Sequence, residues 1–311
     1  MTPDRESIRE SAPEDSARKT YLYLRVGVVS LAIFLAASLA IEMASDDSTW
    51  LGSISAYYYT AVRSVFVGSL VAMGLCLITI KGRDFAAEDL LLNLAGMCAP
   101  VVALVPTPLE DDPRCPSPAR CVPPEFIPGV ENNIKALLVV GVLGLLFAAV
   151  TVRAHRRLDL VAFALAAVGF IAFALVFATK RDAFLDYAHY GTAIPMFGLI
   201  VAVTVVNAVF AEDFVESGGT PTLIKTGRTL RNLYWMIAAL MTITIVAAVV
   251  IFLVKAGGGP EPGSHWVFVI EAILLFLFSA FWVLQTLQYA EDGDPVSVRR
   301  GYAGSARSAG P

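Results

Sequence analysis

The feature that most constrains this chain is a series of long apolar runs separated by short polar segments. Each run covers roughly 17–25 residues, the length of helix needed to cross the hydrocarbon core of a bilayer. The eight runs fall at residues 26–43, 59–80, 89–105, 134–152, 158–179, 187–211, 233–254 and 266–289. A lipid-facing segment must satisfy its own backbone hydrogen bonds, and no run alternates as the strands of a barrel do. The sequence therefore predicts an all-α polytopic membrane helix bundle with about eight transmembrane helices.

Composition agrees with this fold class. Apolar residues make up 57% of the 311 residues and charged residues 16%, whereas a soluble domain carries roughly 25% charged residues. The net charge of −4 gives no reason to expect a nucleic-acid partner. The polar segments 1–25 and 291–311 have no apolar core, and we expect them to be disordered cytoplasmic tails on either side of an eight-span domain at 26–290.

The distribution of basic residues predicts the orientation. With eight spans, loops on the side of the two termini carry roughly 16 Lys and Arg residues against roughly 6 on the other side, so both termini should be cytoplasmic in a multi-pass protein of the cell membrane. Cys115 and Cys121 bracket a Pro-rich loop that then lies outside. An oxidising compartment favours a disulfide between them; the alternative is a pair of free or metal-binding thiols.

The candidate site begins in the segment SISAYYYTAVRSVFVG at residues 53–68. Ser55, Tyr59 and Arg63 are spaced by four, so they share a face if the helix starts early. Arg63 lies one to two turns inside the apolar zone, and Glu271 lies at a comparable depth in the last run, which makes the two natural partners by sign and depth. In the alternative interpretation Arg63 snorkels outward and Glu271 locks two helices together.

Two histidines fall on the same side of the membrane. Asp186 and His189 are at i and i+3, an arrangement that suits a metal ligand or a general base, and His265 precedes the last run. The alternative for Asp186 is a solvated charge at a helix start. Toward the cytoplasmic side, Asn207 is interpreted as a helix-to-helix hydrogen bond, and Gln285 as an interfacial residue.

The segment at 53–68, followed by EDLLLNLAGMCAPVVALVPT, resembles a group of bacterial multi-span membrane proteins that carry a SISAYY-type segment, an Arg and a VFVG turn in this order. The resemblance covers residues 50–108 and implies a membrane fold without a particular activity. A more distant resemblance is to the membrane hydrolases that include alkaline ceramidases and adiponectin-type receptors, which hold zinc near one membrane face. It implies a site made of Ser55, Asp186, His189 and His265, but the HxxxH motif of that superfamily is missing here.

The leading hypothesis is an integral membrane protein, non-enzymatic and without a cofactor, that binds a membrane lipid headgroup or small amphiphile. Its outward-facing polar pocket would be lined by Ser55, Tyr59, Arg63 and Glu271, with His189 and His265 at the rim. An alternative is a metal-dependent intramembrane hydrolase in which zinc is held by Asp186, His189 and His265. A third is a structural or sensory membrane subunit.

Overall fold

The computed structural model describes residues 5–45, 50–80, 87–109, 112–115, 120–151, 157–216, 226–256 and 265–289. Eight α-helices and one short 3₁₀-helix fill this part of the chain, and it contains no strand, which confirms the all-α fold class. The elements are α1 (Arg5–Met43), η1 (Ser55–Tyr59), α2 (Arg63–Thr79), α3 (Ala87–Leu104), α4 (Ile127–Thr151), α5 (Arg157–Thr179), α6 (Arg181–Glu216), α7 (Gly227–Ala256) and α8 (Trp266–Tyr289).

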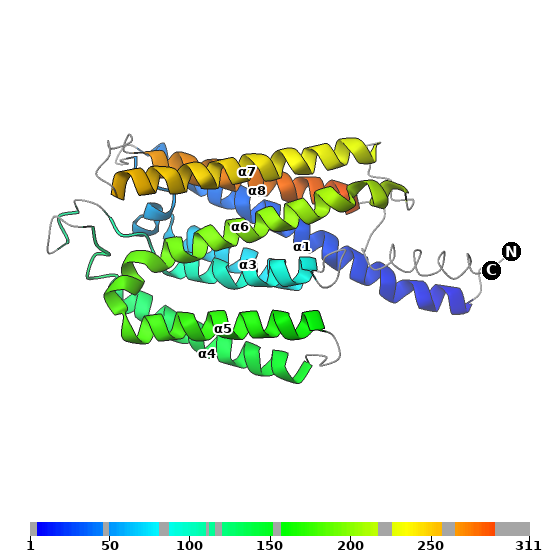
Figure 1. The fold of residues 1–311 in the computed structure, drawn as a ribbon, viewed down its shortest axis with the longest axis horizontal. Helices are drawn as coiled ribbons and strands as arrows, with labels where there is room; N and C mark the ends of the chain where they lie inside the picture. The colour runs from blue at the N-terminus through cyan, green and yellow to red at the C-terminus, as the bar shows by residue number, and fades with distance from the viewer. Residues whose placement is uncertain are drawn as a thin grey trace.

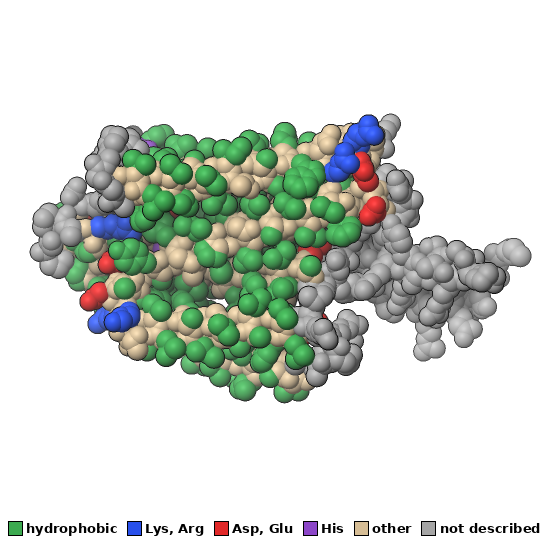
Figure 2. All heavy atoms as spheres, viewed as in Figure 1, with side chains coloured by type: hydrophobic (Ala, Val, Ile, Leu, Met, Phe, Trp, Pro, Cys, Tyr) green, Lys and Arg blue, Asp and Glu red, His purple; other side chains and the backbone are tan. Residues whose placement is uncertain are grey.

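Seven of these helices are long and apolar enough to cross a membrane, and α2, with 17 residues, is a shorter apolar helix. The helices labelled in Figure 1 run roughly along one long axis, with α1 tilted to it. Figure 2 shows apolar side chains along the length of the bundle and charged side chains at its two ends. This is the surface expected of a membrane-spanning protein, because lipid accepts apolar side chains along the middle and water accepts charges at the ends.

Six of the helices form a closed ring around the core. Neighbours pack in the order α1, α2, α3, α6, α7 and α8, and α8 packs back on α1. Large side chains such as Met73, Leu77, Phe281 and Trp282 are buried inside this ring. At the crossing of α2 and α3, a Cβ on Gly74 would lie 2.8 Å from the Gly96 carbonyl oxygen, so the absence of side chains lets the two backbones touch. The ring therefore holds the main core of the molecule, and α2 and α3 are in close backbone contact within it.

Helices α4 and α5 form a hairpin outside the ring (Figure 1). Their most apolar windows are 6% and 0% buried, far less than the 44% of α3. The hairpin is attached through a small apolar cluster in which Val130 and Ile134 of α4 pack near Phe184 of α6. Most of its surface is therefore left for lipid.

One end of the bundle holds η1, the loop from Val105 to Phe126 and the start of α8; we call it the disulfide end. Helix α1 begins and α8 finishes at the opposite end. Helix α1 begins at Arg5 and continues into the span, within the segment 1–25 for which the sequence analysis expected a disordered tail. The predicted tail at 291–311 lies outside the described residues.

The second predicted helix starts later than the sequence suggested. Residues Ser55–Tyr59 form a separate 3₁₀-helix, and the chain turns extended at Thr60, with φ −117° and ψ −172°. The Thr60 hydroxyl donates to the Tyr57 carbonyl, and the Thr60 carbonyl accepts from the Arg63 N–H. Thr60 thus ends one helix and starts the next, and the prediction that Ser55, Tyr59 and Arg63 share one helix face is wrong.

Candidate functional site

Glu271 is the centre of the polar cluster at the disulfide end. Its Oε2 accepts the backbone N–H of Ile54 at 2.6 Å and that of Ser55 at 3.3 Å, and its Oε1 accepts the Ser55 hydroxyl at 2.9 Å. The carboxyl group therefore holds the start of η1, where N–H groups have no partner within the helix and favour a negative charge. In this way α8 fixes the connection between α1 and α2.

Further hydroxyl groups surround Ser55. Its Oγ lies 3.2 Å from Ser53 Oγ and 3.2 Å from Thr107 Oγ1, which brings the start of η1 against the end of α3. The Tyr59 hydroxyl donates to the Thr107 carbonyl at 2.9 Å. Burial raises the pKa of Tyr59 well above its ordinary value, so this hydroxyl keeps its proton and remains a donor. The structure thus brings Ser55, Tyr59 and Glu271 into one hydrogen-bonded region.

Arg63 does not join this region. Its Nη2 donates to the Tyr58 hydroxyl at 3.0 Å, and its Cζ lies 4.5 Å from the centre of the Tyr58 ring and 5.3 Å from that of Phe126. The expected ion pair between Arg63 and Glu271 is absent from the described contacts of either residue, so that expectation is wrong. Two aromatic faces and a phenol hold the half-buried guanidinium in place of a carboxylate.

The two histidines are far from forming one site. His189 is 2% exposed, and its Nδ1 lies 2.7 Å from the Val105 carbonyl oxygen, so it is a hydrogen-bonded core side chain rather than a residue at a pocket rim. His265 Nε2 lies 3.3 Å from the Trp50 carbonyl oxygen. Among the described residues, no group of three or more His, Cys, Asp or Glu side chains could hold a metal ion. Asp186, His189 and His265 are therefore not brought together as a ligand set.

A groove of about 640 Å³ lies beside the cluster, between α1 and α8. Small side chains open it on the α1 side, with Ala32, Ala36 and Ala40 one turn apart. The full lining is Ala32, Ile33, Ala36, Leu39, Ala40, Met43, Ala44, Ile54, Phe268, Ala272, Leu275, Phe276 and Ser279. The Ile54 that lines the groove is the residue whose N–H donates to Glu271.

An aromatic group lies at the disulfide end of this groove. The ring of Trp50 stacks on Phe268 at 5.7 Å between centroids and lies 5.3 Å from His265. Phe268 in turn lies 6.3 Å from Tyr57. The groove could not be predicted from the sequence, because it lies between the first and last helices of the chain.

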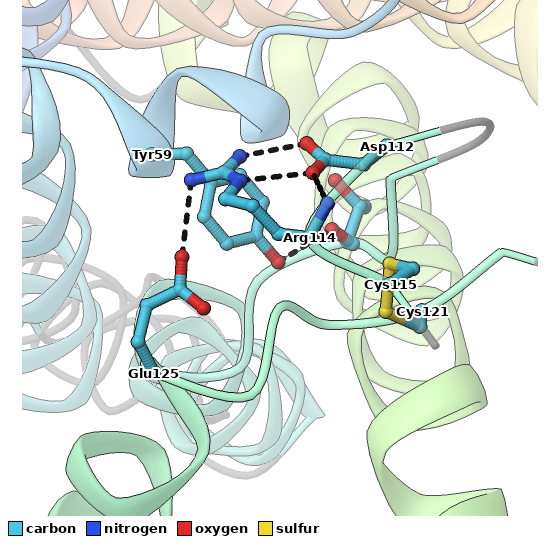
Figure 3. The surroundings of a disulfide bond; sticks show 7 residues. Tyr59, Asp112, Arg114, Cys115, Cys121 and Glu125 are labelled. Atoms are coloured by element: carbon cyan, nitrogen blue, oxygen red, sulfur yellow. Dashed lines mark hydrogen bonds and ion pairs between the residues drawn. A yellow bond between two sulfur atoms is a disulfide. The ribbon is translucent and has the colours of Figure 1, made fainter. Parts of the chain in front are cut away.

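The predicted disulfide between Cys115 and Cys121 is confirmed, with the two Cα atoms 6.0 Å apart. Figure 3 shows its surroundings, where Arg114 points between Asp112 and Glu125 close to Tyr59. Hydrogen bonds from Arg114 lower the pKa of Asp112 below its ordinary value. The disulfide and this ion-pair group shape the loop that covers the Tyr59 side of the cluster.

A second polar cluster, of which the sequence predicted only the helix-to-helix hydrogen bond of Asn207, lies near the opposite end of the bundle. It joins helices α1, α3, α6, α7 and α8, and none of its side chains is more than 5% exposed. We call it the buried polar network; its members are Arg25, Glu88, Asn207, Tyr234, Gln285 and Gln288. Arg25 was expected in a polar tail, but α1 continues through it and its side chain is buried in the ring. Gln285, expected near an interface, lies close to the end of α8 and is also buried.

The amide of Gln285 connects the charged groups of the network. Its Oε1 accepts Arg25 Nε at 3.3 Å, and its Nε2 donates to Asn207 Oδ1 at 2.8 Å. Asn207 Nδ2 donates to Glu88 Oε1 at 2.8 Å, and Tyr234 donates to Gln288 at 2.5 Å. Polar side chains buried at this depth are costly unless they are paired, so the network holds five helices in register.

Comparisons with protein-family models, curated proteins and solved structures found no match to this chain. The resemblance of residues 50–108 to a bacterial membrane-protein group therefore stays a prediction. What the structure defines is a class, the helical membrane-spanning proteins, with an apolar groove and a polar cluster at the disulfide end and a buried polar network at the other.

Proposed function

We propose that the protein is a non-enzymatic membrane protein that binds an amphiphile of the bilayer in the groove between α1 and α8. The acyl chain would lie along the groove, and the polar headgroup would lie at its disulfide end, near Trp50, His265 and the Ser55–Glu271 pair. The observation that carries the proposal is the position of this groove, which is open at the side of a membrane-spanning bundle and meets the polar cluster at one end.

The dimensions of the groove suit an acyl chain. Its lining on α1 runs from Ala32 to Ala44, which is about 18 Å at 1.5 Å per residue. Half of a hydrocarbon core of about 30 Å is about 15 Å, the depth that the tails of one leaflet fill. The groove therefore extends through one leaflet, and apolar and small side chains line nearly all of it.

The headgroup end combines hydrogen-bonding groups with aromatic rings. Ser55 and Glu271 lie behind Ile54, and Trp50 and His265 lie beside Phe268 at the entrance. Aromatic side chains with one polar edge favour the headgroup level of a membrane. Arg63 and His189, expected to line the same pocket, belong instead to separate contacts.

We place the disulfide end outside the cytoplasmic membrane and both termini in the cytoplasm. The excess of Lys and Arg in the loops of the other end supports this orientation, and so does the Cys115–Cys121 disulfide, which an oxidising compartment preserves. The alternative of a zinc hydrolase has less support, because Asp186, His189 and His265 do not converge.

Native mass spectrometry of the purified protein tests the proposal. The wild type should retain a lipid or added lysophosphatidylcholine, and Ala36→Trp should lose it, because the indole fills the groove. Ala37→Trp is the matched control, since Ala37 is exposed on the same helix and does not line the groove. Equal retention by all three proteins would contradict the proposal, and Ala40→Phe provides a second blocking variant if Ala36→Trp does not accumulate.

A further inference from the structure

The groove and the buried polar network share two helices. The groove is lined by residues of α1 from Ala32 to Ala44 and of α8 from Phe268 to Ser279. The network takes Arg25 from α1 and Gln285 from α8. A change in the spacing of α1 and α8 at one end of the bundle therefore acts on the network at the other end.

The two helices are separated at the disulfide end and tied together at the opposite end. Inward of the groove, Val28 and Trp282 are 0% exposed and close the space between the ring helices. About one turn further along each helix, Arg25 donates to Gln285 and lies over the Tyr289 ring, with Cζ 4.5 Å from its centre. Helices α1 and α8 thus enclose the groove near the disulfide end and are joined near the opposite end by the Arg25–Gln285 hydrogen bond.

The side chains of the buried polar network have few arrangements in which every polar group keeps a partner. Arg25 and Glu88 are each 2% exposed, so a side chain that loses its partners leaves a charge or polar group buried in an apolar core. Small helix shifts at such contacts produce a change between discrete arrangements rather than a gradual one. Gln285 contacts Asn207 and lies 3.4 Å from Glu88, so a shift of α8 reaches α6 and α3.

A buried atom without a partner lies between the groove and the network. Among the described residues, Trp282 Nε1 is buried and makes no hydrogen bond. An unpaired donor in an apolar core is unfavourable, and it raises the free energy of this packing arrangement relative to one in which the indole finds an acceptor. Trp282, on the segment of α8 that connects the two sites, would therefore gain a hydrogen bond in any arrangement that brings an acceptor to its indole.

We propose that the protein is a sensor in which an amphiphile between α1 and α8 spreads the two helices and opens the buried polar network at the opposite end. The inference rests on the proposed function, because it needs the groove to be the binding site. The Arg25–Gln285 contact breaks first. The shift of α8 then displaces α3 and α6 through the contacts of Gln285, and α7 through the Tyr234–Gln288 hydrogen bond. Binding at the outer face is thereby reported at the cytoplasmic face.

The test measures the distance across the cytoplasmic end of the full-length protein in phosphatidylcholine nanodiscs. Spin labels are placed at Tyr23→Cys on α1 and Thr229→Cys on α7, both exposed positions outside the network, after replacement of the free Cys76 and Cys98 by Ala. Lysophosphatidylcholine should shift the electron–electron distance distribution by about 2 Å or more, the size of helix shifts in such transitions. The native-mass measurement is made on the same labelled protein.

Substitutions separate transmission from binding. Ala36→Trp should produce the shift without lysophosphatidylcholine, whereas Ala37→Trp should not. Arg25→Gln should shift the distribution on its own and abolish the response while lysophosphatidylcholine still binds. If the wild type binds lysophosphatidylcholine and its spin-label distances stay unchanged, the network only holds the helices together. That result overturns the sensor proposal and leaves the proposed function standing. If lysophosphatidylcholine does not bind, both are overturned.

Discussion

Replacement of Glu271 by Ala should destabilise the protein by removing the acceptor that holds η1. The carboxyl group accepts two close hydrogen bonds, from Ile54 N–H at 2.6 Å and Ser55 Oγ at 2.9 Å, and a longer one from Ser55 N–H at 3.3 Å. A hydrogen bond contributes roughly 1 kcal/mol between neutral groups and up to about 3 kcal/mol with a charged acceptor, so the two close bonds amount to about 2–6 kcal/mol. Glu271→Gln keeps one carbonyl oxygen and should lose about half as much.

The measurement is reversible unfolding in mixed micelles, followed by circular dichroism. A double-mutant cycle with Ser55→Ala should give a coupling energy of about 0.5–3 kcal/mol, because the two side chains contact each other directly. Additive effects of the two substitutions, or a Glu271→Ala protein with the unfolding free energy of the wild type, would refute the assignment of Glu271 as the residue that fixes η1.

Two further predictions concern the scaffold and the loop. Gly74→Ala should destabilise the bundle by about 1–3 kcal/mol, because its Cβ would lie 2.8 Å from the Gly96 carbonyl oxygen. The control is Gly68→Ala on the same helix, whose Cβ would meet nothing within 4 Å and which should be nearly neutral. Equal unfolding free energies for the two variants would contradict the close crossing of α2 and α3. Acid should loosen the disulfide loop: hydrogen bonds from Arg114 lower the folded pKa of Asp112, so their stabilisation is present above the unfolded pKa of about 3.9 and is lost as the pH falls through the lower folded value. In the wild type, amide hydrogen exchange in the loop should therefore accelerate, relative to the intrinsic rate, as the pH is lowered below about 4. In Arg114→Gln this pH dependence should be lost. The same pH profile in both proteins would exclude the contact between Asp112 and Arg114.

The spans and the disulfide were predictable because their signals are local. A run of apolar residues predicts a helix wherever it lies in the chain, and two Cys residues six positions apart in a Pro-rich loop can reach each other without knowledge of the rest of the fold. The break at Thr60 was less visible, since it depends on a side chain that replaces the helical hydrogen bonds of its neighbours.

The partners of the charged residues were not predictable, because they depend on which helices are neighbours. Arg63 and Glu271 match in sign and depth, but they lie on α2 and α8, which are not neighbours in the ring. The rings of Tyr58 and Phe126 hold Arg63 instead. One member of the buried polar network was predicted, because Asn207 was interpreted as a helix-to-helix hydrogen bond and it bonds Glu88 of α3 and Gln285 of α8. The same sequence signal was present at Gln285. Asn207 and Gln285 are both polar residues within apolar runs, and such residues in a membrane span usually face other helices.

The most direct test of amphiphile binding is photo-crosslinking in bilayers that contain a phosphatidylcholine with a diazirine on one acyl chain. Peptide mapping should find cross-links concentrated on residues 32–44 of α1 and 268–279 of α8, and Ala36→Trp should remove this concentration. The internal reference is the α4–α5 hairpin, whose most apolar windows are almost entirely unburied and which contributes no residue to the lining of the groove between α1 and α8. Labelling spread over α4, α5 and the other helices in proportion to their exposed surface, with no excess at the groove, would contradict the account.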